Sequence, residues 1–143
     1  MIKEDYCSFE VAKLLKEKGF PQDYDRYHSM IYNEEDYEDE YEVQRMVTKT
    51  RFVKAGTLSS YPVGVPEPKC YAPTHQMAMK WLREVHNISI EPFVDYGSGD
   101  DYWWTVDISK IKKNGLITEL SGYKSYEEAV EAALKYYLEN FIY

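Results

Sequence analysis

Apolar residues recur every three or four positions in three stretches of the chain, a spacing that places their side chains on one face of an α-helix. In the middle stretch this apolar stripe consists of Ala78, Trp81, Leu82 and Val85. Thr74 stands where a helix N-cap belongs, and Asn87 stands where the helix would close. We therefore expect a helix over residues 74–86 that packs through this stripe.

The two outer helices are predicted from their ends as well as from their apolar spacing. Ser8 is a natural N-cap, and Gly19 occupies the position where a left-handed residue ends a helix. These signals predict a helix over about residues 8–19. A capping box begins at Ser125, which predicts a third helix over about residues 125–140.

After the middle helix the apolar period changes to two, which is the pattern of half-buried β-strands. One face of the clearest strand carries Tyr102, Trp104, Val106 and Ile108. The opposite face carries Trp103, Thr105, Asp107 and Ser109. Asn114-Gly115 then predicts a tight hairpin turn. The expected fold class is α+β, with an antiparallel sheet of about four to five strands packed against three helices.

The region between the first two helices has an unusual distribution of charge. Residues 33–42 carry seven carboxylates in ten positions, and their repulsion predicts a mobile acidic loop. Residues 43–54 are basic and rich in Val, Thr and Phe, which favours a strand beside the preceding segment. Proline and glycine recur over residues 56–73, predicting a connection without regular structure. We expect residues 1–143 to form one domain.

Composition excludes several classes of partner. The net charge of −8 argues against direct nucleic-acid binding and against an anionic membrane surface, because both require Lys and Arg. The sequence holds no apolar run of 18 residues and no apolar leader at its N-terminus, so we expect no membrane span and a cytoplasmic location. Basic or neutral proteins are the expected partners.

Candidate catalytic and metal-binding residues are weakly indicated. His75 and His86 are eleven positions apart on the predicted helix, a rise of about 16 Å, which is too far for one shared metal ion. We expect His75 to make helix-end hydrogen bonds or to face solvent. Cys7 and Cys70 lack metal-type spacing and are interpreted as buried or bystander thiols. The sequence therefore predicts no catalytic, cofactor or metal residue, and it disfavours an enzyme.

Aromatic residues favour an interaction function instead. The chain has 15 tyrosines, a residue type enriched at protein interfaces, and Trp103 lies on the strand face opposite Trp104. The candidate partner contacts are Trp103, Tyr37, Tyr41, Glu38 and Glu40. The expected partner is another protein, and a second copy of the chain is one option.

Three segments resemble a family of small uncharacterised proteins from gut bacteria and their phages or mobile elements. They are residues 4–20, 72–88 and 126–137, which contain mainly the three helices and less than half of the chain. The resemblance implies a bacterial or phage cytoplasmic setting, and it implies no activity and no functional residue.

Two alternatives to an interaction module stay open. One is an acidic decoy that imitates nucleic acid and inhibits a host defence protein, which the charge and the phage link favour. The other is a small-molecule enzyme with a pocket between the sheet and the middle helix.

Overall fold

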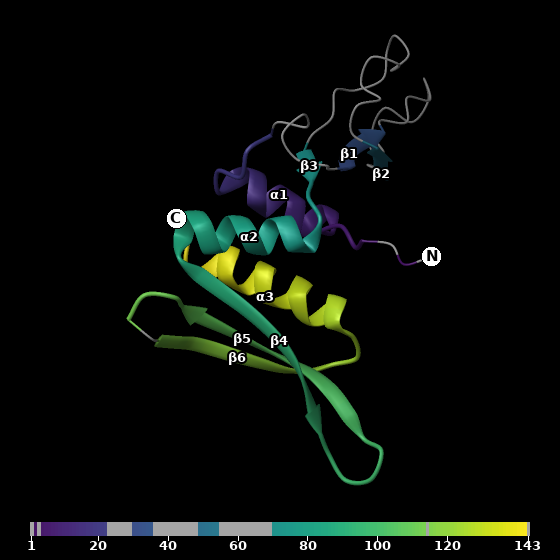
Figure 1. Ribbon diagram of the computed structural model, residues 1–143. Helices are drawn as coiled ribbons and strands as arrows, with labels where there is room; N and C mark the ends of the chain where they lie inside the picture. Colours follow the sequence, from purple (N-terminus) through teal and green to yellow (C-terminus); the bar gives the residue numbers. More distant parts are fainter. Residues whose placement is uncertain are drawn as a thin grey trace.

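Three helices and two small antiparallel sheets make up the described part of the chain (Figure 1). The computed structural model describes residues 2, 4–22, 30–35, 49–54, 70–113 and 115–142. The helices are α1 (Phe9–Glu17), α2 (His75–His86) and α3 (Tyr126–Asn140). The strands are β1 (Met30–Glu35), β2 (Lys49–Lys54), β3 (Cys70–Ala72), β4 (Ile88–Tyr96), β5 (Tyr102–Lys110) and β6 (Gly115–Tyr123). The predicted α+β class and the three helices are confirmed.

The predicted single sheet of four or five strands is not confirmed, because the described strands form two sheets of three. One sheet has the order β4-β5-β6 and the other has the order β2-β1-β3, and all pairs are antiparallel. The helices lie between the two sheets (Figure 1). Helix α2 connects β3 to β4 and crosses from one sheet to the other, so these two strands belong to different sheets.

The helix ends follow the sequence signals closely. Ser8, Thr74 and Ser125 each accept a hydrogen bond from a backbone N–H three residues later, at 3.1–3.2 Å. At the end of α1, Phe20 N–H donates to the Leu15 carbonyl (2.8 Å) across a left-handed Gly19. Within the described residues, no helix combines the length and apolar content needed to cross a bilayer.

Helix α3 lies between the β4–β5–β6 sheet and the other two helices, and it contributes more buried core residues than any other described element (Figure 1). The largest fully buried apolar side chains come from several elements: Leu15, Leu82, Ile108, Leu134 and Leu138. The predicted stripe of α2 is correct for its first three members and wrong for Val85, which is 58% exposed. Val85 projects from α2 in nearly the same direction as Ala78. It lies in the last turn of the helix, where Arg83, Glu84 and Val85 are all exposed.

The predicted inner face of β5 is confirmed for Trp104, Val106 and Ile108, whereas Tyr102 at the start of the strand is 62% exposed. Val106 and Ile108 are fully buried against the helices, and the ring of Trp104 makes an edge contact with Tyr126 of α3 at 5.6 Å. Trp103 lies on the opposite face. Thr105 also lies on that face, but it is fully buried, which the alternation of apolar residues did not predict.

Three further sequence predictions need correction. Residues 33–35 belong to β1, so the acidic segment begins inside a strand, and residues 36–42 lie outside the described residues. Residues 70–72 form β3 within the segment predicted to be irregular, because they pair with β1. Gly115 pairs with Lys110 instead of sitting in a two-residue turn, so the β5–β6 loop is longer than predicted.

Candidate functional site

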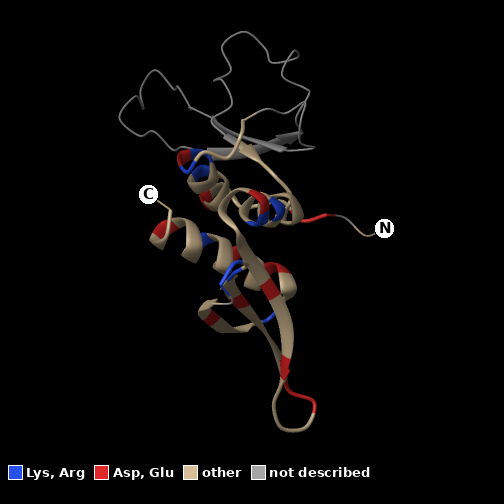
Figure 2. Cartoon of the chain, turned by 60° about the vertical axis from the view of Figure 1, so that its left-hand side comes forward, with Lys and Arg blue, Asp and Glu red and all other residues tan. Residues whose placement is uncertain are grey.

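The face of the β4–β5–β6 sheet turned away from α3 is called the outer face here. The strand register places these residues on it: Ser89, Glu91, Phe93, Asp95, Trp103, Thr105, Asp107, Ser109, Leu116, Glu119 and Ser121. These residues include four carboxylates and no Lys or Arg. Figure 2 shows acidic residues along the projecting β4–β5 hairpin as far as its loop. The outer face is therefore a negatively charged surface on an ordered sheet.

A row of three carboxylates crosses this face. Glu91 pairs with Asp107, and Asp107 pairs with Glu119 on the third strand. Hydrogen bonding with Asp107, partial desolvation and the nearby carboxylates raise the pKa of Glu119 above its ordinary value. Oδ1 of Asp107 is buried and accepts no hydrogen bond within the described residues. The row is thus electrostatically unfavourable as it stands.

A second polar group lies one row further along the outer face. The Thr105 hydroxyl donates to Oδ2 of Asp95 (2.6 Å), and the Ser121 hydroxyl lies 2.8 Å from Oγ1 of Thr105. Because Thr105 is fully buried, its hydroxyl needs these partners to avoid a desolvation penalty. The group fixes the position of the Asp95 carboxylate.

Trp103 is the one predicted contact residue that lies within the described part of the chain. It pairs with Asp95 in the strand register and is half-buried. A Cβ atom on Gly97 would come within 2.9 Å of its Cζ3 atom, so the absence of a side chain on Gly97 lets the indole lie against the backbone. The other four predicted contacts, Tyr37, Glu38, Glu40 and Tyr41, lie outside the described residues.

A separate cluster of polar residues forms where α1 and α2 begin. The carboxylate of Glu131, on α3, accepts hydrogen bonds from the backbone N–H (2.7 Å) and the hydroxyl (2.8 Å) of Ser8, the N-cap of α1. It also accepts a bond from Nε2 of His75, the first residue of α2, at 2.9 Å. Burial raises the pKa of Glu131, but the bonds from His75 and Ser8 outweigh burial and lower it overall. Glu131 therefore joins the three helices as an anion.

Cys7 completes this cluster from the residue before the α1 N-cap. Its sulfur, a ring nitrogen of His75 and a carboxylate oxygen of Glu131 all lie within 4.8 Å of one another. The residue types are those of a cysteine-hydrolase triad, but Cys7 is 0% exposed. Desolvation, reinforced by the charge of Glu131, raises the pKa of the thiol well above its ordinary value. Full burial and a raised pKa both disfavour the free thiolate that a nucleophilic cysteine requires.

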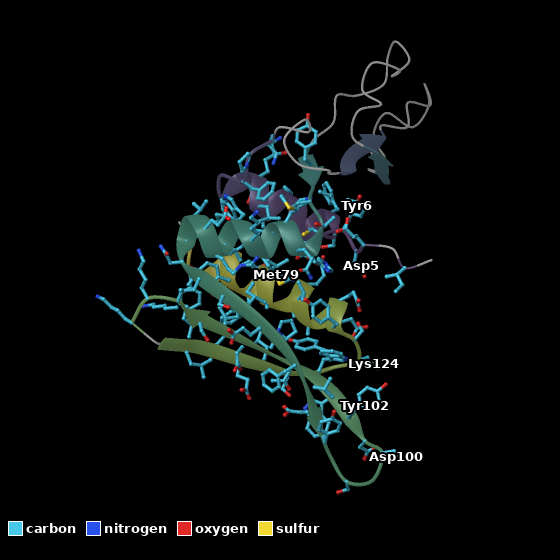
Figure 3. All side chains as sticks on the ribbon, viewed as in Figure 1. Asp5, Tyr6, Met79, Asp100, Tyr102 and Lys124 are labelled. Atoms are coloured by element: carbon cyan, nitrogen blue, oxygen red, sulfur yellow. The ribbon has the colours of Figure 1, made fainter. Side chains whose placement is uncertain are left out.

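An open cleft of about 570 Å³ adjoins the cluster. It is lined by Asp5, Tyr6, Ser8, His75, Tyr123, Glu127, Glu128 and Glu131. Figure 3 shows Asp5 and Tyr6 beside the beginning of α2. The lining has four carboxylates and no Lys or Arg, so the cleft attracts cations.

The sequence predicted that His75 either makes helix-end hydrogen bonds or faces solvent; the structure buries it at the beginning of α2 with a hydrogen bond to Glu131. The sequence pattern did not connect His75 with Cys7 or Glu131. The only local signal was that Cys7 and His75 flank the predicted N-caps Ser8 and Thr74. Their meeting depends on how the helices pack.

Comparison of the chain with protein-family models, curated proteins and solved structures gave no match.

Proposed function

We propose that this chain is a protein-interaction module whose outer face binds a basic segment of a partner protein. The observation that carries the proposal is the carboxylate row Glu91–Asp107–Glu119, which is in register across three neighbouring strands. Like charges directly opposite one another destabilise a sheet, and a cationic partner would relieve that repulsion. Lys and Arg side chains also form strong charge-assisted hydrogen bonds with carboxylates.

Trp103 supplies the aromatic part of such a binding surface. A Lys or Arg held by Asp95 would lie near the indole ring, where a cation–π contact adds about 0.5–1 kcal/mol at an exposed site. The ring is supported by the backbone at Gly97, and Asp95 is held by Thr105. Little ordering of these side chains is therefore needed on binding, which favours affinity.

The overall charge supports a basic partner over a second copy of the chain. A net charge of −8 steers cationic proteins toward this molecule and repels a like molecule. A two-fold dimer through the outer face would place its four carboxylates against the same four of another copy. A homodimer through this face is therefore the less favourable form of the proposal.

We place this interaction in a bacterial or phage cytoplasm, which the resemblance of the three helical segments supports. The acidic-decoy alternative uses the same surface and differs only in the partner. It requires that the partner be a DNA-binding protein and that duplex DNA compete with this chain for it. Such competition distinguishes the decoy from a general interaction module.

The proposal can be tested with a fluorescently labelled peptide rich in Lys and Arg, titrated at low and physiological salt. The outer-face triple variant carries Glu91→Gln, Asp107→Asn and Glu119→Gln. The matched control replaces three exposed helix carboxylates: Glu17→Gln, Glu84→Gln and Glu139→Gln. Each triple variant changes the net charge from −8 to −5, because three carboxylates are removed.

The outer-face triple variant should bind the peptide at least about tenfold more weakly than wild type, because charge-assisted hydrogen bonds are lost. The control should remain near wild type. Equal weakening in both triple variants would mean that net charge alone attracts the peptide, and the proposed site would be wrong.

A further inference from the structure

We propose that Cys7, His75 and Glu131 bind a divalent transition-metal ion of the zinc class. The three residues come from the segment before α1, from the start of α2 and from α3. One donor atom from each lies within 4.8 Å of the other two. This site is separate from the outer face and does not depend on the proposed partner binding.

The donor set has the chemistry that zinc prefers. Thiolate sulfur, imidazole nitrogen and carboxylate oxygen are all zinc ligands, with bond lengths of about 2.0–2.3 Å. In a tetrahedral site such bonds place the donors roughly 3.3–3.7 Å apart. Oε1 of Glu131 and Nε2 of His75 are 2.9 Å apart, so these two donors would have to separate by about 0.4 Å to share an ion. The remaining separations, up to 4.8 Å, require an inward movement of about 1 Å, within the reach of small side-chain rotations.

His75 provides an independent indication of a missing partner. Its side chain is 5% exposed, and one ring nitrogen is bonded to Glu131. The other ring nitrogen, Nδ1, is buried and has no hydrogen-bond partner within the described residues. Buried polar atoms in native proteins nearly always have a partner. The hydrogen bonds of the described residues therefore leave the buried imidazole of His75 incompletely satisfied.

The surroundings suit a cation as well. Glu131 is held by two bonds from Ser8, so one side of the site is positioned before any ion arrives. His75 and Glu131 line the acidic cleft, which gives an ion a route from solvent. Three protein ligands leave a fourth position for water, the arrangement of zinc sites that remain open to a further ligand.

Cobalt(II) tests the site directly, because a cobalt–thiolate bond produces a charge-transfer absorption band. Full-length protein is titrated with Co²⁺, and Zn²⁺ is then added to displace it. Wild type should develop the thiolate band at one equivalent of Co²⁺, and Zn²⁺ should abolish it. Cys7→Ser, a nearly isosteric change, should remove the band. His75→Gln and Glu131→Gln should each weaken Co²⁺ binding by at least about tenfold.

Two control variants locate the ion. Cys70→Ser removes the other thiol, and Glu128→Gln removes a carboxylate from the cleft wall outside the donor set. Both should keep the wild-type band and affinity. Absence of a thiolate band in wild type would overturn the proposal, and this result does not depend on the folding of any variant. A band that survives Cys7→Ser, or that is lost in Cys70→Ser, would overturn it equally.

Discussion

Nε2 of His75 lies 2.9 Å from Oε1 of Glu131, and this contact connects the first residue of α2 to α3 across 56 positions of sequence. The same carboxylate is bonded to the N-cap of α1. The beginnings of two helices therefore meet at one anion, where the positive ends of both helix dipoles stabilise it. Glu131 is thus predicted to be important for stability in the metal-free protein.

Replacing Glu131 with Ala should lower the free energy of unfolding by about 3 kcal/mol, because partly buried charge-assisted bonds to His75 and Ser8 are lost. Urea denaturation with a chelator present measures this value. Glu127→Ala, in the first turn of the same helix, is the control and should change stability by less than about 1 kcal/mol, because it removes only a helix-dipole interaction. Similar losses in the two variants would show that the contacts of Glu131 contribute no more to the free energy of unfolding than those of Glu127.

Trp81→Ala should cost about 3–5 kcal/mol, the range for deleting a buried aromatic side chain. The Trp81 ring is buried and makes edge contacts with Phe20 at 5.4 Å and His86 at 4.7 Å. Val85→Ala on the same helix should stay within about 0.5 kcal/mol, because Val85 is 58% exposed. Denaturant unfolding compares them, and a loss under about 1 kcal/mol for Trp81→Ala would mean that the α2 packing is misassigned.

Glu119→Gln should raise the melting temperature at pH 7, because it removes a charge opposite Asp107. The pKa of Glu119 is raised in the folded state, so its protonation stabilises the fold. This contribution is fully present below the ordinary glutamate pKa of about 4.3 and is lost as pH rises through the folded-state value. The advantage of the variant should therefore disappear near pH 4. A variant that melts below wild type at pH 7 would contradict the repulsion.

Thr105→Val should destabilise the sheet by about 1–3 kcal/mol, because it removes a buried donor to Asp95 and leaves Ser121 without its partner. Thr105→Ser keeps the hydroxyl and should recover most of this loss. The two variants are compared by chemical denaturation. Equal stability of the valine variant and wild type would mean that water replaces the Thr105 hydroxyl as the hydrogen-bond donor to Asp95 without any loss of stability.

Features encoded by neighbouring residues were predictable from the sequence. The caps at Ser8, Thr74 and Ser125, the closure at Gly19 and the inner face of β5 each depend on side chains within a few positions. Local hydrogen bonding and apolar alternation decide these structures, so pattern and propensity suffice. The prediction that Val85 is buried was wrong, because apolar periodicity gives the direction of a side chain around the helix. It does not give how far along the helix the neighbouring elements extend.

The candidate sites depend on contacts that no local pattern encodes. Ser8 and Glu131 are 123 positions apart, and their hydrogen bonds require the packing of α1 on α3. The carboxylate row requires the register of three strands, in which a shift of one residue would turn Asp107 toward the helices. β3 was missed because its pairing with β1 outweighs the local preference of a Pro-rich segment.

The most direct test of the proposed interaction is quantitative capture from a bacterial lysate with three baits. These are wild type, the outer-face triple variant and the helix-carboxylate control, used at equal loading and eluted with a salt gradient. We expect basic proteins to be retained by wild type and by the control, to elute as salt rises, and to be absent from the outer-face triple variant. Identical retention on all three baits would contradict the assignment of partner binding to Glu91, Asp107 and Glu119.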